Sequence, residues 1–264
     1  GCMFGIVPRE LWKREHRPDR LNRILLGLTC PLITRGRDAI LIDSGIGNRL
    51  DASERKHFSR DNGWLIDQLG ALGIEPGDIT HLIVSHLHFD HAGGISRGQK
   101  SGALVAAFPR ARIFVQQREV DAVTVSRNER LRAAYRHVEE VIAPVRANVE
   151  VIDGDTEIIP GVRVIVTGGH THGHQAVVVE SGGESFIHMG DIVPTRSHLR
   201  PAWNQSYDLD AIRTMEQKVY YLDLAALGRW WVSFAHDETI LAARVARDDR
   251  GRFKLVETIP VRPR

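Results

Sequence analysis

The stretch Thr80-His81-Leu82-Ile83-Val84-Ser85-His86-Leu87-His88-Phe89-Asp90-His91-Ala92-Gly93-Gly94 changes abruptly from apolar residues to residues that can bind metal. Leu82 to Val84 form a continuous apolar run, which is typical of a strand buried on both faces. If the chain stays extended beyond this run, His86 and His88 project to the same side. Gly93-Gly94 then provides a loop in which backbone can pass close by. The stretch therefore predicts a buried strand that delivers ligands to one place.

The candidate ligands at the end of this strand are three imidazoles and one carboxylate: His86, His88, Asp90 and His91. Imidazole and carboxylate suit zinc, iron, manganese or nickel, whereas a thiolate-rich set would indicate structural zinc. The alternative is a chance cluster of solvated histidines in a chain that has 13 of them. Four potential ligands in six residues, directly after a buried strand, favour a catalytic metal site that is completed by ligands elsewhere.

Length and composition predict one globular domain spanning residues 1–264, because 42% of the residues are hydrophobic and 26% are charged. The net charge is only +2 and the basic residues are spread out, so nucleic acid is not an expected partner. Two cysteines form no disulfide framework, and the chain has neither a membrane-spanning apolar run nor a signal pattern. We expect a cytoplasmic protein without a membrane partner. The chain begins as though a preceding strand were missing.

Hydrophobic periodicity predicts strands flanked by helices in both halves of the chain. We expect a first group of strands at 24–34, 39–43, 82–84 and 111–115, with a helix at 63–72 and a long, peripheral or lid-like helix at 119–142. A second sheet is expected from strands at 149–153, 157–159, 162–167, 176–180 and 185–189, followed by a helix at 209–227 and strands at 230–234 and 252–258.

Three later strands also run into residues that can bind metal. The strand at 162–167 leads to Gly169-His170-Thr171, the strand at 185–189 leads to Gly190-Asp191, and the strand at 230–234 leads to Ala235-His236-Asp237. Each of these alone could be a satisfied polar residue at a strand end. Together with the first motif, they supply a complete metal site.

These motifs resemble those of the metallo-β-lactamase fold superfamily, whose H-x-H-x-D-H signature is intact from His86 to His91. The resemblance covers nearly the whole chain, beginning at Ile40 to Gly45 and including the three later motifs in the same order. It implies an α+β fold, the αβ/βα four-layer sandwich of two mixed sheets flanked by helices. It also implies a dinuclear metal-dependent hydrolase.

The resemblance assigns the ligands position by position. It implies that one ion is bound by His86, His88 and His170, and the second ion by Asp90, His91 and His236. Asp191 would bridge the two ions, and Asp43 would be a buried residue that steadies the ligands. The ions would most often be zinc, although manganese, cobalt or iron would accept the same ligands. We interpret His172 and His174 as hydrogen-bonding or pocket residues and His81 as structural.

The predicted chemistry is hydrolysis by a hydroxide that bridges the two ions, with Asp90 and Asp191 as catalytic residues. His88 stands where relatives with two redox irons are expected to carry a carboxylate, and this favours a hydrolase. Asp90 could relay a proton to the leaving alkoxide. No Gly-x-Ser-x-Gly motif is present, and none is needed.

Two further stretches resemble quorum-quenching N-acyl-homoserine lactonases: Met3 to Pro8, and Gly190 to Thr195 followed by Tyr207 to Asp210. A lactone or related carboxylic ester is therefore the predicted small-molecule substrate. Many such lactonases carry a tyrosine three residues after the bridging aspartate, where this chain has Pro194. Tyr207 or His198 could replace it as the donor to the developing oxyanion.

Apolar residues near the N-terminus could line a pocket for an acyl chain or aryl group, or they could fill a core. The predicted substrate-pocket residues are Phe4, Val7, His198, Trp203 and Tyr207. The same residues near the N-terminus could also pack across a homodimer.

The sequence leaves four alternative functions open. A broad-specificity arylesterase or phosphotriesterase would use the same site. A thioesterase like glyoxalase II and a nuclease are less favoured, because the chain shows no cluster of basic residues placed for glutathione and only diffuse positive charge. A non-catalytic metal-binding or scaffold protein should tolerate lost ligands, and none of the seven is lost.

Overall fold

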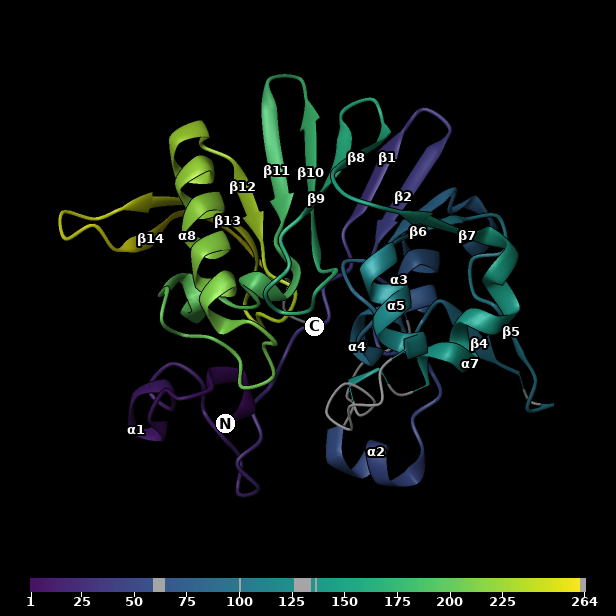
Figure 1. Ribbon diagram of the computed structural model, residues 1–264, viewed down its shortest axis with the longest axis horizontal. Coiled ribbons are helices and arrows are strands. Elements are labelled where there is room, and N and C mark those ends of the chain that lie inside the picture. Colours follow the sequence, from purple (N-terminus) through teal and green to yellow (C-terminus); the bar gives the residue numbers. More distant parts are fainter. Residues whose placement is uncertain (59–64, 100, 126–133, 136, 262–264) are drawn as a thin grey trace. The chain divides into compact units, whose positions relative to one another are not determined.

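The computed structural model describes residues 1–58, 65–99, 101–125, 134–135 and 137–261 (Figure 1). The chain divides into two compact units. The central unit is Cys30–Asp153, and the flanking unit combines Gly1–Thr29 with Gly154–Arg264. Each unit contains a mixed sheet and helices, so the predicted α+β class is confirmed.

The central unit is built on a five-stranded sheet of order β1-β2-β3-β6-β7. Its strands are β1 Leu32–Arg35, β2 Asp38–Ile42, β3 His81–Ile83, β6 Arg112–Gln116 and β7 Val149–Ile152. The hairpin β1–β2 is antiparallel, whereas the other three pairs are parallel. Strand β3 therefore lies in the middle of the sheet, where it is buried on both faces as its apolar run predicts.

The helices of the central unit are α2 Ala52–Phe58, α3 Leu65–Ala71, α4 Phe89–Ala92, α5 Gln117–Val125 and α7 Val138–Ile142, with 3-10 turns at Pro76–Asp78 and Ala143–Asn148. Leu69 of α3 joins Leu82 of β3 and Ile113 of β6 in one hydrophobic cluster. A small hairpin, β4 Ser96–Gly98 with β5 Leu104–Ala106, follows α4. The core thus holds β3 rigid, together with the ligands that follow it.

The flanking unit contains a seven-stranded sheet of order β14-β13-β12-β11-β10-β9-β8. Its strands are β8 Thr156–Ile159, β9 Val162–Val166, β10 Gln175–Ser181, β11 Glu184–His188, β12 Trp231–Ser233, β13 Ile240–Arg247 and β14 Phe253–Pro260. Every pair is antiparallel except the parallel pair β11–β12.

The main helix of the flanking unit is α8 Ala211–Gly228, which packs against β13 (Figure 1). Asp210 caps its N-terminus by accepting a hydrogen bond from the Arg213 amide, and Arg229 ends it in the left-handed conformation. The other helical segments are α1 Arg9–Trp12 and 3-10 turns at Cys2–Phe4, Gly190–Ile192 and Arg196–Leu199.

Several predicted elements are corrected by the structure. The strand at 149–153 was predicted in the second sheet, but β7 is the edge of the first sheet and runs parallel to β6. Of the strand predicted at 24–34, only the end is observed, as part of β1. Earlier in this segment, the backbone amides of Gly27 and Thr29 donate hydrogen bonds to the carbonyls of His236 and Ala235. Strands β4, β5 and β13 were not predicted. Of the helix predicted at 119–142, α5 and α7 are observed, while 126–133 and 136 lie outside the described residues.

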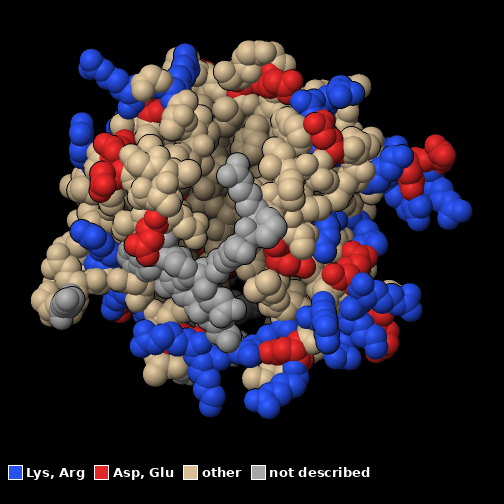
Figure 2. Space-filling model, turned by 180° about the vertical axis from the view of Figure 1, so that it is seen from behind, with Lys and Arg blue, Asp and Glu red and all other residues tan. Residues whose placement is uncertain are grey.

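Two surface properties bear on possible partners. On the face drawn in Figure 2, Lys and Arg lie interspersed with Asp and Glu among the described residues, without a stripe of one sign. Within the described part of the chain, no helix combines the length and the apolar character that a membrane crossing requires.

We predict that Leu82→Ala lowers the free energy of unfolding by about 2 to 5 kcal/mol, because it empties a fully buried position in β3. Leu72→Ala is the control, since Leu72 is 71% exposed and its loss should cost less than about 0.5 kcal/mol. Urea unfolding of both variants measures the difference. Equal losses would contradict the central position of β3.

Candidate metal centre

Four of the predicted ligands lie in the central unit, in the six-residue stretch from His86 to His91 that follows β3. His86 is fully buried, and its ring centroid lies 4.4 Å from that of His88 and 4.1 Å from that of His91. One ring nitrogen of His86 lies within 4.8 Å of a ring nitrogen of each of these two neighbours. Asp90 also places a carboxylate oxygen within 4.8 Å of a ring nitrogen of His91.

The turn that carries Asp90 and His91 is the short helix α4, and a close backbone approach holds its end. The Gly94 amide donates to the Gly45 carbonyl at 3.0 Å, and a Cβ on Gly94 would stand 2.0 Å from the Ser44 carbonyl oxygen. Only glycine fits at this position. The predicted close passage at Gly93-Gly94 is therefore confirmed.

Asp43, at the end of β2, connects the ligand segment to the neighbouring strand. Its buried carboxylate accepts hydrogen bonds from the Ser85 amide at 2.7 Å, from the Ser85 hydroxyl at 2.9 Å and from His91 Nδ1 at 2.8 Å. Asp43 adopts a left-handed backbone with φ of 58°. An aspartate held in this conformation with three donors is a strained position of the kind that clusters at functional sites.

Glu119 of α5 supports the same segment and was not singled out in the sequence. Its side chain is 1% exposed and accepts hydrogen bonds from the Leu87 amide at 2.9 Å and the Tyr135 hydroxyl at 3.0 Å. The Tyr135 ring packs against His88, with the centroids 5.3 Å apart. Helix α5 therefore fixes the backbone between the first two histidines.

The flanking unit gathers the other three predicted ligands around Asp191. One carboxylate oxygen of Asp191 lies 3.3 Å from His170 Nε2, and the other lies 3.0 Å from His236 Nε2. All three side chains are at least 96% buried. Asp191 therefore lies between the two imidazole rings, with one carboxylate oxygen close to each.

Both histidines of this cluster are oriented through Nδ1. His170 Nδ1 donates to the buried Asp208 carboxylate at 2.7 Å, and His236 Nδ1 donates to the Gly27 carbonyl at 2.9 Å. Gly169 precedes His170 with φ of 84°, and a Cβ there would stand 2.6 Å from the Thr214 hydroxyl of α8. The glycine turn therefore lets α8 approach the ligand closely.

The donors in each unit fit divalent metal ions. Any two ligand atoms of a tetrahedral zinc ion lie about 3.4 Å apart. The distance between His170 Nε2 and Asp191 Oδ2 is 3.3 Å, which is close to this value. His91, His170 and His236 each donate Nδ1–H to an oxygen, which fixes the tautomer in which Nε2 is the ligand atom. The donor set contains no thiolate, which is the usual composition of a catalytic zinc site.

The remaining histidines of the motifs have structural surroundings. His174 Nε2 accepts the Asp191 amide hydrogen at 3.1 Å, so it is a local hydrogen-bonding residue, whereas His172 is exposed. His81 lies in β3 as predicted and stacks on Phe114.

Two of the predicted pocket residues are in the interior of the flanking unit. Phe4 is fully buried, stacks on Trp12 and His198, and meets Trp203 edge-on. His198 is fully buried as well: Nε2 donates to the Met3 carbonyl at 2.6 Å, and Nδ1 accepts from the Thr195 hydroxyl at 2.8 Å. Burial, reinforced by the Lys218 charge, lowers the pKa of His198 to about 3.

The other pocket residues are half-buried beside this cluster, so their pocket role stays a prediction. Val7, Trp203 and Tyr207 pack against Phe4 and its neighbours. The Tyr207 hydroxyl donates to the Met3 sulfur at 2.7 Å, and its ring lies edge-on to His170 with the centroids 5.8 Å apart. Both nitrogens of His198 and the Tyr207 hydroxyl are engaged in these hydrogen bonds, so the role of either residue as oxyanion donor stays a prediction.

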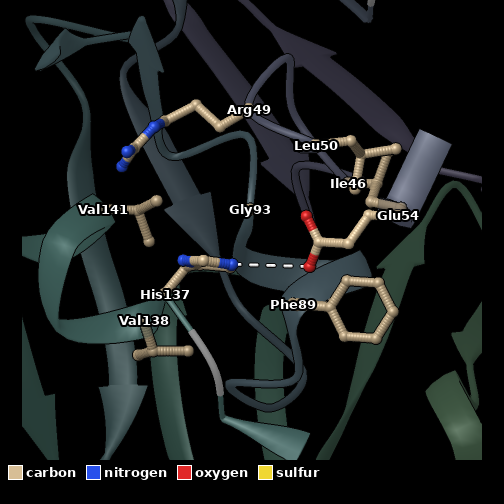
Figure 3. A pocket seen from close by; sticks show the side chains of 9 residues that line it. All are labelled: Ile46, Arg49, Leu50, Glu54, Phe89, Gly93, His137, Val138 and Val141. Carbon is tan, nitrogen blue, oxygen red and sulfur yellow. Dashed lines mark ion pairs between the residues drawn. The ribbon is translucent and has the colours of Figure 1, made fainter. Parts of the chain in front are cut away.

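The central unit also contains a small pocket beside α4, which Figure 3 shows. Apolar side chains form most of its wall, and His137 Nε2 lies 3.4 Å from Glu54 across it. Arg49, at its rim, pairs with Glu140 at 2.7 Å. None of the predicted ligands lines this pocket, although Phe89 and Gly93 belong to the ligand segment.

Sequence reasoning also missed Asp208, Gln205 and Lys218, which surround the flanking cluster. Gln205 Nε2 lies 3.3 Å from both the main-chain and a side-chain oxygen of Asp191. Lys218 was detectable as a charged residue within the buried stripe of α8, four residues after Thr214 and four before Leu222. Asp208 and Gln205 lie in a loop without hydrophobic periodicity, so the sequence pattern does not indicate that they are buried.

Comparisons with known proteins find similar sequences and structures. The family model described as "Metallo-beta-lactamase superfamily" matches residues 28–239. A curated N-acyl homoserine lactonase from Bacillus cereus is 30% identical over 181 residues, which are 63% of this chain and 63% of that protein. The chain spans 39% to 63% of the length of the curated lactonases that it matches.

Solved structures that resemble this chain over most of its length include two hydrolases. A probable metal-dependent hydrolase from Staphylococcus aureus has a TM-score of 0.86 and 30% identity, covering 98% of this chain and 92% of that one. An N-acyl homoserine lactone hydrolase, solved with the product N-hexanoyl-L-homoserine at its catalytic metal center, has a TM-score of 0.63 and 25% identity. The match covers 82% of this chain and 84% of that one.

We predict that the buried His198 makes the metal-free chain less stable in acid. Because burial lowers its pKa to about 3, the unfolded chain takes up this proton first, and stability is lost as pH falls from about 6.5 towards about 3. The contribution is at most about 1.4 kcal/mol per pH unit. Urea unfolding at several pH values should show a shallower dependence for His198→Gln, and an unchanged dependence would contradict the assignment.

Proposed function

The chain belongs to the metallo-beta-lactamase superfamily, and from this premise we propose that it is a metal-dependent hydrolase that opens lactones of the N-acyl-homoserine type or cleaves a related carboxylic ester. The observation that carries the proposal is the position of Asp191. Its two carboxylate oxygens lie 3.3 Å from His170 Nε2 and 3.0 Å from His236 Nε2. Two metal sites that share one carboxylate need this arrangement.

We propose that residues 1–264 form one hydrolase domain that binds two ions through seven ligands. The proposed ligands are His86, His88 and His170 for one ion, and Asp90, His91 and His236 for the other, with Asp191 bridging. Asp43 would orient His91 as its hydrogen bond at 2.8 Å suggests. Zinc is the proposed metal, since imidazole and carboxylate without thiolate are common ligands of catalytic zinc.

When bound, the two ions supply a water of lowered pKa and a Lewis acid for the carbonyl oxygen. The chain's residues then have separate tasks. Water adds to the carbonyl carbon and gives a proton to the half-buried Asp90 carboxylate. The ring C–O bond then breaks, and the protonated Asp90 passes this proton to the leaving alkoxide oxygen. Tyr207, whose ring lies against His170, is the proposed hydrogen-bond donor to the carbonyl oxygen.

The lactone assignment is supported by the relatives. The similar Bacillus cereus protein is named an N-acyl homoserine lactonase, and the 25% identical hydrolase holds a homoserine product at its metal center. The half-buried Val7 and Trp203, near Tyr207, would suit the acyl chain of such a substrate.

The direct test measures kcat/KM of the metal-loaded protein on four substrates: acyl-homoserine lactones, simple aryl esters, a phosphotriester and lactoylglutathione. We expect the lactones to be preferred. A clear preference for an aryl ester or phosphotriester would replace the lactone with the broader esterase activity. In parallel, elemental analysis should find close to two ions per chain, and chelation should abolish activity. A folded chain that binds no metal would exclude hydrolysis altogether.

Asp90→Asn separates proton transfer from metal binding. It keeps one oxygen as a ligand but removes the proton-accepting carboxylate, so we expect kcat to fall by about 100-fold to 10,000-fold with little loss of metal. Rate measurements with metal analysis of the same samples provide the comparison. If the variant loses both ions, the role in proton transfer is not supported.

A further inference from the structure

Helix α8 buries a lysine where its pattern calls for an apolar residue. The buried face of α8 consists of Thr214, Lys218, Leu222 and Ala225. Lys218 itself is fully buried. An ammonium group removed from water is costly unless hydrogen bonds replace its hydration. A lysine at this position therefore requires an explanation beyond packing.

The ammonium group of Lys218 is bound by a single loop. Nζ donates to the Trp203 carbonyl at 2.7 Å, to Asn204 Oδ1 at 2.9 Å and to the Pro201 carbonyl at 3.4 Å. The three donors of the ammonium group thus meet three oxygens of one short loop. Burial lowers the pKa of Lys218 to about 7, and the nearby charge of Asp208 counteracts this effect.

The residues that follow these acceptors contact the proposed ligands. Gln205 Nε2 donates to the main-chain oxygen and to Oδ2 of Asp191, both at 3.3 Å. The Gln205 amide donates to Asp208 Oδ2 at 3.1 Å, while the other oxygen of Asp208 accepts from His170 Nδ1 at 2.7 Å. The loop at 201–208 therefore contacts Lys218 near its beginning and two proposed ligands, Asp191 and His170, near its end.

We propose that Lys218 is a positioning residue for the metal centre, because its ammonium holds this loop in the conformation in which Gln205 and Asp208 orient Asp191 and His170. The inference rests on the proposed function, since Asp191 and His170 are metal ligands only under that proposal. Residues that orient metal ligands typically contribute about 10-fold to 100-fold to metal affinity. Lys218 acts one step further away, so the lower end of this range is expected.

The test compares Lys218→Met with Glu216→Met. The first substitution keeps the length of the side chain and removes its donors, whereas the second changes an exposed residue two positions away on α8. The Zn²⁺ dissociation constant is measured by competition with a chromophoric chelator, and urea unfolding is measured on the metal-free chains. We expect Lys218→Met to weaken Zn²⁺ binding about 10-fold and Glu216→Met to leave it unchanged. Lower stability with unchanged Zn²⁺ affinity would mean a merely structural role and would overturn the proposal.

A double-mutant cycle tests the route through the loop. Gln205→Met removes the hydrogen bonds to Asp191 without burying a charge. If Lys218 acts through this loop, Lys218→Met should cost clearly less affinity in the Gln205→Met background than in the wild type. Fully additive losses would overturn the route. If Lys218→Met does not fold, Asn204→Ala, which removes one acceptor of the ammonium, takes its place in the same cycle.

Failure of this inference differs from failure of the proposed function. If the wild type binds Zn²⁺ but hydrolyses no lactone or ester, the proposed activity is wrong, and the dissociation constants alone decide the role of Lys218. If the wild type binds no Zn²⁺, both proposals are overturned.

Discussion

Hydrogen bonds to the Nδ1 atoms of buried histidines are the constraint on which the candidate site depends. An imidazole can present Nε2 to a metal only if its ring cannot turn, and an oxygen acceptor at Nδ1 provides that restriction. Asp43 supplies it for His91, Asp208 for His170, and the Gly27 carbonyl for His236. Each acceptor comes from a segment distant in sequence from the ligand that it holds. The fold must therefore bring these segments together before any ligand is oriented.

The sheets provide the rigidity that these contacts require. In the central unit, β2 and β3 are parallel neighbours, so Asp43 and the histidine motif leave the sheet at the same edge. In the flanking unit, β11 and β12 are also parallel neighbours, and they lead to Asp191 and His236. Parallel pairing at two places thus positions Asp43, the histidine motif, Asp191 and His236. At Gly94 and Gly169, two segments lie so close together that a Cβ atom would collide with Ser44 or Thr214, and only glycine lacks this atom.

The ligands could be predicted from the sequence because each follows an apolar run that ends in polar residues. The supporting residues could not. Strand β7 was assigned to the wrong sheet because its periodicity shows that it is extended but not which strand it pairs with. Glu119 is a charged residue in a helix of mixed polar and apolar residues, and its burial is explained only by the contacts with Leu87 and Tyr135. Phe4 and His198 were predicted to line a pocket, yet they pack against each other in the interior.

The sequence by itself determined the chemistry of the donors: five histidines and two aspartates, their order, the strands before them and the family that they indicate. Residue type and spacing are local properties, and local properties can be recognised in a linear chain. Only the tertiary structure decided which oxygen orients which imidazole, and that Lys218 is buried against the loop next to Asp191 and His170. Those contacts join residues that are 14 to 38 positions apart. Their cost and benefit depend on burial, which the whole fold determines.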